Sequence, residues 1–225
     1  MRTAIFSLFS LLLSASFIQT VQAAEELVTL VGGDQVKVLY FEPNASAEAP
    51  PLAILISGGS NSEFMARAQF WMGKEMVARG WAIALPVSPG GRHYFVDNAE
   101  HFPALIADLR RIHTLRPGRT LLVGISSGGS AALEIAARDP RQYLGVVATP
   151  GRLHEDTALG ALQGLPIFLR VGEKDDFRWN KRLDQFINRL EAAGARVDAA
   201  EVPGAKHIFP LNWDELEPWL QQLQQ

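Results

Sequence analysis

Runs of aliphatic and β-branched residues alternate along this chain with stretches of helical character. The clearest runs are residues 52–56, 81–85 and 120–125, which are apolar almost without interruption. A strand with one face in water would alternate apolar and polar residues, so these runs indicate strands that are buried on both faces. Buried strands that alternate with helices are typical of a mainly parallel sheet covered by helices. The chain is therefore predicted to have an α/β fold.

Weaker patterns complete the expected order of elements. Two runs flank Gly32-Gly33-Asp34 and predict an opening hairpin over residues 27–41, followed by a polar connector over 44–51. Helices are predicted over residues 63–79, 101–114, 127–138, 179–193 and 213–223, and further strands over residues 143–149, 166–171 and 197–202.

Local signals set some of the helix ends and loops. Ser60 and Glu63 have the spacing of a capping box, and Gly80 suits the end of the helix predicted over residues 63–79. Residues 86–98 are rich in glycine, proline and aromatic side chains and are expected to form a loop. The segment 150–165 has room for one short helix but for no cap domain.

Length, charge and cysteine content limit the classes of function. The 225 residues fit one domain with one core. The net charge of −3 arises from mixed signs, so no basic field is expected to bind nucleic acid. The chain contains no cysteine, which excludes disulfides, a thiolate nucleophile and cysteine-bound zinc. Any nucleophile must therefore be an oxygen or a nitrogen atom.

The N-terminus is typical of a secretory signal peptide. Arg2 precedes an apolar stretch over residues 4–18, and Val21-Gln22-Ala23 has the small-x-small pattern of a cleavage site. The apolar stretch is short for a bilayer that needs about 20 residues, which favours cleavage over retention as a membrane anchor. We expect removal of residues 1–23, a single domain over residues 24–225, and export to the periplasm or the medium. No later segment is long and apolar enough to predict a membrane span.

Gly124-Ile125-Ser126-Ser127-Gly128 matches the pattern G-x-S-x-G and lies between a predicted strand and a predicted helix, as that motif requires. The sharp turn strains the serine backbone and leaves space only for small residues two positions before and after it. Ser126 has glycine at both positions, whereas Ser127 follows Ile125 by two residues, so Ser126 is the better candidate nucleophile. The five residues alone would also fit a serine that only caps a helix.

A serine hydroxyl needs a base within hydrogen-bond reach and a third group that orients this base. The loop after residues 166–171 carries Asp175 and Asp176, and the loop after residues 197–202 carries His207. The chain order Ser, Asp, His is that of α/β-hydrolases. The other four histidines have no comparable position and are interpreted as ordinary surface or helix residues.

Taken together, residues 57–59, 124–128, 172–175 and 204–207 resemble the four signature loops of the α/β-hydrolase superfamily. They resemble most those of its small, capless esterases and dienelactone-hydrolase-like members, over nearly the whole chain after the signal peptide. The resemblance implies the α/β-hydrolase fold, with a mainly parallel central sheet, helices on both faces and no large cap domain. It also implies that Ser126 is the nucleophile, His207 the general base and Asp175 the acid that orients the base.

The resemblance further implies an oxyanion hole made by the backbone N–H groups of Gly59 and Ser127. Ser57 stands where this loop commonly begins with histidine in these families, but only backbone N–H groups are needed to bind an oxyanion. Dienelactone hydrolases proper use a cysteine nucleophile, which this chain lacks. The resemblance therefore predicts a serine hydrolase and not the dienelactone activity itself.

The most specific function that follows is hydrolysis of a small or surface-presented carboxylic ester through an acyl-enzyme at Ser126. His93, Tyr94 and Phe95 would either wall an acyl or alcohol pocket or anchor their loop. Three polar residues also lie near the expected loops with no fixed direction: Asn61, Arg152 and Arg178.

Other functions remain compatible with the same residues. A peptidase, amidase, thioesterase or acyltransferase would use the same three side chains, and an exported binding protein without catalysis could share the fold. The sequence contains no phosphate-binding G-x-x-x-x-G-K-[ST], no G-x-G-x-x-G after a strand and no H-E-x-x-H. We therefore expect neither a cofactor nor a catalytic metal.

Overall fold

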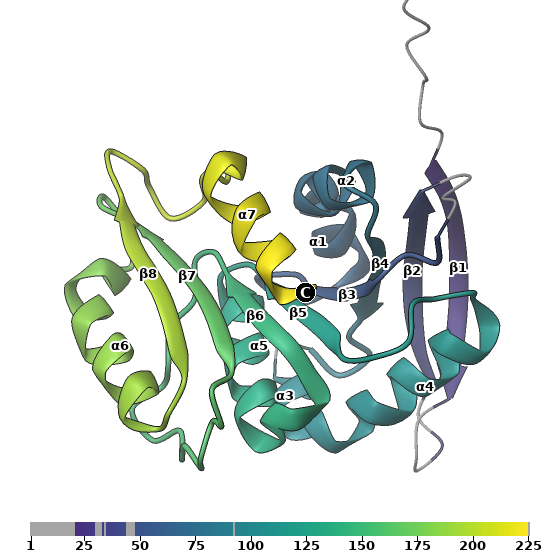
Figure 1. The fold of residues 1–225 in the computed structure, drawn as a ribbon, viewed down its shortest axis with the longest axis horizontal. Helices are drawn as coiled ribbons and strands as arrows, with labels where there is room; N and C mark the ends of the chain where they lie inside the picture. The colour runs from purple at the N-terminus through teal and green to yellow at the C-terminus, as the bar shows by residue number, and fades with distance from the viewer. Residues whose placement is uncertain (1–20, 30–32, 34, 44–47, 92, 225) are drawn as a thin grey trace, which may run out of the picture.

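The computed structural model of the protein describes residues 21–29, 33, 35–43, 48–91 and 93–224. In these residues a single 8-stranded sheet has the strand order β1-β2-β4-β3-β5-β6-β7-β8 (Figure 1). The strands are β1 (Val21–Thr29), β2 (Gln35–Pro43), β3 (Leu52–Ile56), β4 (Ala82–Val87), β5 (Thr120–Gly124), β6 (Tyr143–Ala148), β7 (Pro166–Gly172) and β8 (Arg196–Val202). From β4 to β8 all neighbouring strands are parallel, as the continuous apolar runs predicted.

The antiparallel edge of the sheet contains the predicted hairpin. β1 pairs antiparallel with β2, and β2 pairs antiparallel with β4. Gly33 has φ +95° in the connection, whereas Gly32 and Asp34 lie outside the described residues, as do residues 1–20 and residues 44–47 of the connector. β1 begins earlier than predicted, with Val21 paired to Pro43. Cleavage after Ala23 would therefore remove the first part of this edge strand and leave residues 24–29 to pair with β2.

Helices cover both faces of the sheet. In Figure 1, α1, α2 and α7 lie above the sheet, and α3, α4, α5 and α6 lie below it or beside it. The helices are α1 (Glu63–Ala68), α2 (Phe70–Ala78), α3 (Tyr94–Asp97), α4 (Phe102–Ile112), α5 (Ser127–Arg138), α6 (Leu183–Ala192) and α7 (Trp213–Leu223).

Alternation along each central strand fills two cores at once. Every residue of β3, β5 and β7 is buried. In β3, Leu52, Ile54 and Ile56 pack into the core under α4, α5 and α6, while Ala53 and Leu55 pack into the core under α1, α2 and α7. Successive side chains of a strand point to opposite faces, so both sets must be apolar. This is why the central strands read as uninterrupted apolar runs.

The helix predicted over residues 63–79 begins at Glu63, as predicted, but it is not continuous. It divides at Gln69 (φ −100°, ψ 7°) into α1 and α2. The N-cap is Ser62, whose Oγ accepts a hydrogen bond from the Met65 N–H at 3.4 Å, so the capping box predicted from Ser60 is wrong. The predicted end is confirmed, because Gly80 follows α2 with φ +85°.

Two connecting segments also differ from expectation. Residues 94–97, expected in a loop, form the short helix α3, and a 3-10 turn over Ala99–His101 leads into α4. The segment 150–165 contains no helix, and it is attached to the core by the buried side chains of Leu153 and Leu162. The segment 179–193 opens with a 3-10 turn, Trp179–Arg182, before α6. No large cap domain occurs in the described residues, and the architecture is the α/β-hydrolase fold.

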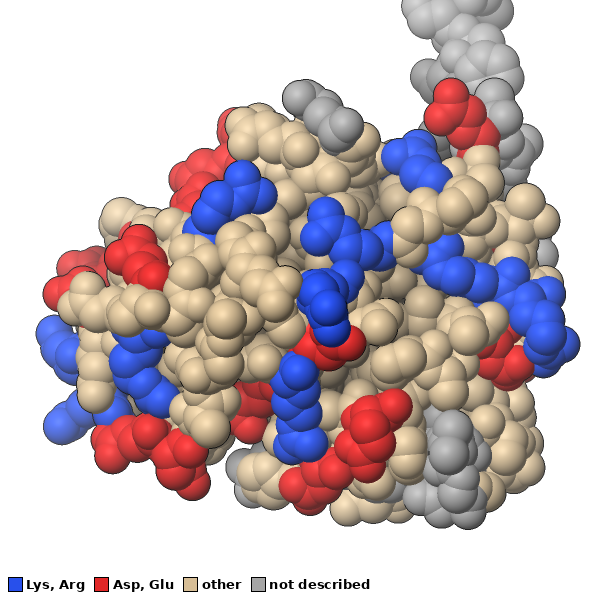
Figure 2. Space-filling view, turned by 60° about the horizontal axis from the view of Figure 1, so that its bottom comes forward, with Lys and Arg blue, Asp and Glu red and all other residues tan. Residues whose placement is uncertain are grey.

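The surface carries both signs of charge. Figure 2 shows basic and acidic side chains interspersed over one face of the molecule, with a short band of basic groups near its middle. Within the part of the chain that the structure describes, no helix combines the length and the apolar character needed to cross a membrane.

Candidate active site

Ser126 lies at the turn between β5 and α5 in a strained conformation, with φ 58° and ψ −121°. A positive φ is uncommon for a residue with a Cβ atom and is typical of functional turns. Although Ser126 occupies the N-cap position of α5, its side chain makes no capping hydrogen bond. Its Oγ lies instead 2.7 Å from Nε2 of His207. The turn therefore directs the hydroxyl toward the His207 imidazole and not toward the helix.

The glycines on both sides of Ser126 are required by packing. A Cβ atom at Gly124 would lie 2.2 Å from the carbonyl oxygen of Gly128, and one at Gly128 would lie 2.1 Å from that of Ile56. Backbone atoms cannot come this close to a real Cβ atom, so neither position accepts a larger residue without movement of the chain. The prediction that this turn needs small residues two positions before and after the serine is confirmed.

His207 and Asp175 reach Ser126 from two other loops. His207 Nδ1 lies 2.9 Å from Oδ2 of Asp175, whose side chain is 0% exposed. The second oxygen, Oδ1, accepts a hydrogen bond from the Phe177 N–H at 2.7 Å. A carboxylate oxygen accepts hydrogen bonds, so this contact favours the tautomer with the histidine proton on Nδ1, which leaves Nε2 to accept from Ser126. Asp176 is exposed.

The loops that carry Asp175 and His207 are packed against each other. A Cβ atom at Gly172, the last residue of β7, would lie 2.0 Å from the carbonyl oxygen of Lys206. The Lys174 N–H donates to the carbonyl oxygen of Ala205 at 2.8 Å. Such close backbone contact fixes the Asp175 and His207 side chains relative to each other.

Two backbone N–H groups near Ser126 have no hydrogen-bond partner among the described residues. Gly59 and Ser127 both line the same cleft as Ser126, and Ser127 Oγ donates to the Gly59 carbonyl oxygen at 3.2 Å. Within the described residues, no hydrogen bond uses the N–H of either residue. Ser127 is the first residue of α5, and the first N–H groups of a helix have no partner inside it. Both N–H groups are free to bind an anionic oxygen.

The cleft at Ser126 has a volume of about 540 Å³. Of the three residues that were predicted to line this cleft or anchor its loop, His93 lines the cleft. Phe95 fits the other predicted alternative, an anchor of its loop, because it is 3% exposed and packs edge-on against Phe102 at 5.8 Å between ring centroids. Val96 of α3 lines the cleft in its place, and the side chain of Tyr94 lies outside the described part of the structure.

Two aromatic residues in this cleft were not predicted as site residues. The rings of Phe177 and Trp179 both stand edge-on to the His207 imidazole, at 4.5 Å and 4.9 Å between centroids. Arg152, whose direction the sequence left open, lines the cleft with its guanidinium 5.4 Å from the Trp179 ring centroid. The available signal was proximity in sequence, because Phe177 and Trp179 follow Asp175 by two and four residues.

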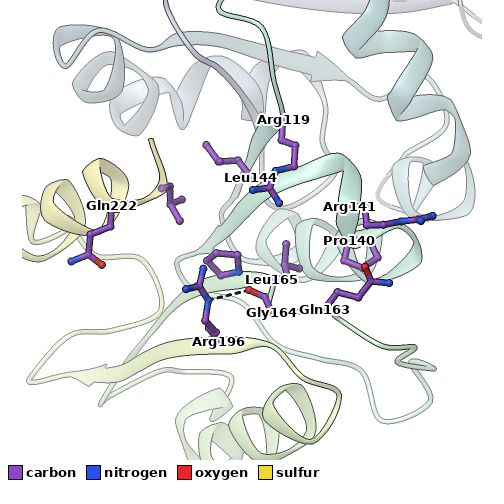
Figure 3. A pocket seen from close by; sticks show the side chains of 11 residues that line it. Arg119, Pro140, Arg141, Leu144, Gln163, Gly164, Leu165, Arg196 and Gln222 are labelled. Carbon is purple, nitrogen blue, oxygen red and sulfur yellow. Dashed lines mark hydrogen bonds between the residues drawn. The ribbon is translucent and has the colours of Figure 1, made fainter. Parts of the chain in front are cut away.

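A second hollow, of about 570 Å³, lies at the amino ends of the parallel strands, on the side of the sheet opposite to their carboxyl ends (Figure 3). Its lining comes from the amino ends of β5, β7 and β8 and includes Arg119 and Arg196, whereas Ser126 follows the carboxyl end of β5. In Figure 3, Arg196 Nε donates to the Gly164 carbonyl oxygen, at 3.1 Å. Among the described residues, no three histidine or carboxylate side chains are grouped to hold a metal ion. The cleft at Ser126 is therefore the candidate active site.

The sheet order and the strained serine turn between β5 and α5 are those of the α/β-hydrolase class of fold. Residues 92–216 match the sequence profile of the dienelactone hydrolase family, which is more than half of the chain. The chain therefore belongs to the dienelactone hydrolase family, and the protein is a hydrolase.

Solved structures of hydrolases share the fold. A candidate dienelactone hydrolase from Klebsiella pneumoniae aligns with TM-score 0.69 and 17% identity over 91% of this chain and 98% of that one. An esterase from the fungus Rhizomucor miehei aligns with TM-score 0.73 and 13% identity over 92% and 84%. A carboxylesterase from Bacillus cereus aligns with TM-score 0.62 and 14% identity over 84% and 93%. A comparison with curated proteins found no match.

Proposed function

We propose that the protein is a serine hydrolase of carboxylic esters in which Ser126 is the nucleophile, His207 the general base and Asp175 the acid that orients the base. One observation carries this proposal. Ser126 Oγ lies 2.7 Å from His207 Nε2, and His207 Nδ1 lies 2.9 Å from a fully buried carboxylate oxygen of Asp175. Membership in a hydrolase family supports the reaction, and esterases with the same fold support the choice of ester.

The reaction proceeds in two halves. Ser126 Oγ attacks the ester carbonyl carbon while its proton passes to His207 Nε2, and the carbonyl oxygen becomes an oxyanion. Protonated His207 then donates this proton to the alcohol oxygen as the C–O bond breaks, which leaves the acyl group on Ser126. A water molecule attacks the acyl carbon with its proton taken by His207. The acid leaves as the proton returns to Ser126.

The oxyanion is bound by the N–H groups of Gly59 and Ser127, which have no other partner in the described residues. Donors that are fixed before the reaction stabilise the developing negative charge without reorganisation. The amino end of α5 begins at Ser127 and adds a favourable dipole at the same place. The open cleft suits a small ester or one presented on a larger surface.

A fluorophosphonate probe tests the proposal directly. Its tetrahedral phosphorus adduct resembles the acyl-transfer intermediate, so label should attach to Ser126. Ser126→Ala should abolish labelling and His207→Ala should nearly do so, since such losses cost on the order of 10⁶ in turnover. Ser127→Ala, which keeps the backbone N–H, should still be labelled at Ser126.

Hydrolysis of p-nitrophenyl esters of increasing chain length accompanies the labelling. A well-folded wild type that takes no label and cleaves no ester in the series would overturn the proposed function. The exported binding protein without catalysis would then be the better interpretation.

We also propose that the protein is exported and loses residues 1–23. The support is the sequence pattern of Arg2, the apolar stretch and Val21-Gln22-Ala23. The register of β1 is compatible with it, because residues 24–29 keep their pairing with residues 35–40 of β2 after cleavage.

A further inference from the structure

Two side chains hold one peptide unit of the loop after β3 from its opposite ends. The Gly58 N–H donates to Oε1 of Gln69 at 2.6 Å. The Ser57 carbonyl oxygen, at the other end of the same peptide unit, accepts a hydrogen bond from Nδ2 of Asn61. The N–H and C=O of a trans peptide point in opposite directions, so this unit cannot rotate without loss of both bonds.

One of the two side chains comes from an uncommon backbone conformation, and the other comes from a break between two helices. Asn61 is 1% exposed and has φ 54°, in the left-handed region that asparagine tolerates better than most residues. Gln69 is the residue that separates α1 from α2, and its side chain makes no capping hydrogen bond to α2. The interruption leaves the Gln69 side chain available for Gly58. A strained position such as that of Asn61 persists where surrounding contacts require it.

We call the two hydrogen bonds from Gln69 and Asn61 the clamp, and the peptide unit between Ser57 and Gly58 the clamped peptide unit. This unit lies directly against the candidate nucleophile. A Cβ atom at Gly58 would lie 3.1 Å from Cβ of Ser126 and 2.7 Å from the Ile125 carbonyl oxygen. A rotation of this unit would therefore disturb the surroundings of Ser126. It would also move Gly59, which follows in the chain and lines the cleft.

The clamp determines which N–H group of the loop remains available. The Gly58 N–H is occupied by Gln69, and the Gly58 carbonyl oxygen accepts from the Asn61 N–H at 3.4 Å. The Gly59 N–H belongs to the same peptide unit as that carbonyl and points away from it. Gly59 thus presents the one N–H of this glycine pair that has no partner in the described residues.

We infer that Gln69 and Asn61 are positioning residues for the oxyanion hole, which hold the peptide unit between Ser57 and Gly58 so that the Gly59 N–H faces the reacting carbonyl. The inference rests on the proposed function and deepens it. The Ser57 side chain does not share this role, because its buried Oγ has no hydrogen-bond partner in the described part of the chain.

Removal of either end of the clamp should lower transition-state stabilisation and leave substrate binding in place. Gln69→Met keeps the length of the side chain and removes the acceptor. Asn61→Gly removes the donor and keeps a residue that accepts the left-handed backbone. Each should lower kcat by about 10- to 100-fold, somewhat less than complete loss of an oxyanion donor, while KM stays within about twofold. The double variant should lose much less than the product of the two, because both release the same unit.

The assay measures kcat per active site, with active sites counted by fluorophosphonate labelling, and KM for a p-nitrophenyl ester. The inhibition constant of a phenylboronic acid, which forms a tetrahedral adduct with the serine, should weaken by the same factor as kcat. A role in folding alone would lower the melting temperature and the number of active sites. It would leave kcat per active site and the inhibition constant of the boronic acid unchanged. Gln185→Met on α6 is the matched control, since the Gln185 side chain is exposed and contacts Arg182.

Wild-type kcat per active site and wild-type boronate affinity in Gln69→Met would overturn the clamp and leave the proposed function intact. A change in KM at constant kcat would overturn it as well. Asn61→Gly tests the other end of the same peptide unit, so the inference does not depend on the folding of one variant. A wild type that hydrolyses no ester would overturn the proposed function and the clamp together.

Discussion

The tautomer of His207 depends on what the side chain at position 175 can accept. Asp175 Oδ1 accepts from the Phe177 N–H at 2.7 Å, and Oδ2 lies 2.9 Å from His207 Nδ1. In Asp175→Asn one of these oxygens becomes an NH₂ group, which can only donate. Because the Phe177 N–H needs an acceptor, the remaining oxygen stays there and the NH₂ group faces His207. Nδ1 must then accept, and the proton moves to Nε2, where it prevents acceptance from Ser126.

The expected loss is large and falls on turnover. A triad base held in the wrong tautomer lowers kcat by up to about 10⁴-fold, which corresponds to about 5.4 kcal/mol at about 1.36 kcal/mol per factor of ten. KM should change little, because the Asp175 side chain is 0% exposed and cannot touch a substrate. The fold should persist, since asparagine has nearly the same shape and keeps both hydrogen-bond contacts.

Steady-state hydrolysis of p-nitrophenyl butyrate at neutral pH gives kcat and KM, and circular dichroism during heating verifies the fold of each variant. Asp176→Asn is the matched control, because Asp176 is the neighbouring carboxylate and is exposed. It should keep the wild-type kcat. Equal losses in the two variants, or a larger loss at Asp176, would refute the assignment of the acid.

Two further predictions concern the turn and the N-terminus. Gly128→Ala should lower the free energy of unfolding by about 3 kcal/mol in urea titrations, because its Cβ atom would lie 2.1 Å from the Ile56 carbonyl oxygen. Gly160→Ala is the control and should be neutral, because no atom lies within 4 Å of its added Cβ. Equal stability of the two variants would contradict the steric argument. Exported protein should begin at Ala24 on N-terminal sequencing, and a mature chain that still begins at Met1 would refute cleavage.

The sheet was predicted well from the sequence because strands buried on both faces consist almost entirely of apolar residues. It failed where a distant contact overrides a local pattern. The helix break at Gln69 serves a hydrogen bond to Gly58, eleven residues away in the sequence, and local helix propensity contains no trace of it. The early start of β1 at Val21 depends on pairing with Pro43, while the local sequence reads as a cleavage site.

The candidate site was predictable where chain position alone determines it. Ser126, Asp175 and His207 each follow a strand of the parallel part of the sheet, and such loops meet at the carboxyl edge. The direction of a side chain inside a short helix was not predictable. Phe95 and Val96 are neighbours in the four-residue helix α3, yet Phe95 packs on Phe102 and Val96 lines the cleft. The sequence does not give the orientation of so short a helix axis.

Phe177 illustrates why the aromatic part of the site left no clear signal. Its backbone N–H donates to Asp175 Oδ1, while its ring packs edge-on against His207, so one residue contacts both the acid and the base. The first contact would be made by any residue except proline, and only the second depends on the aromatic ring. The ring is 67% exposed, although large apolar side chains are usually buried. Exposure is a property of the folded chain and not of the sequence, so the position of Phe177 two residues after a candidate acid did not by itself predict this contact.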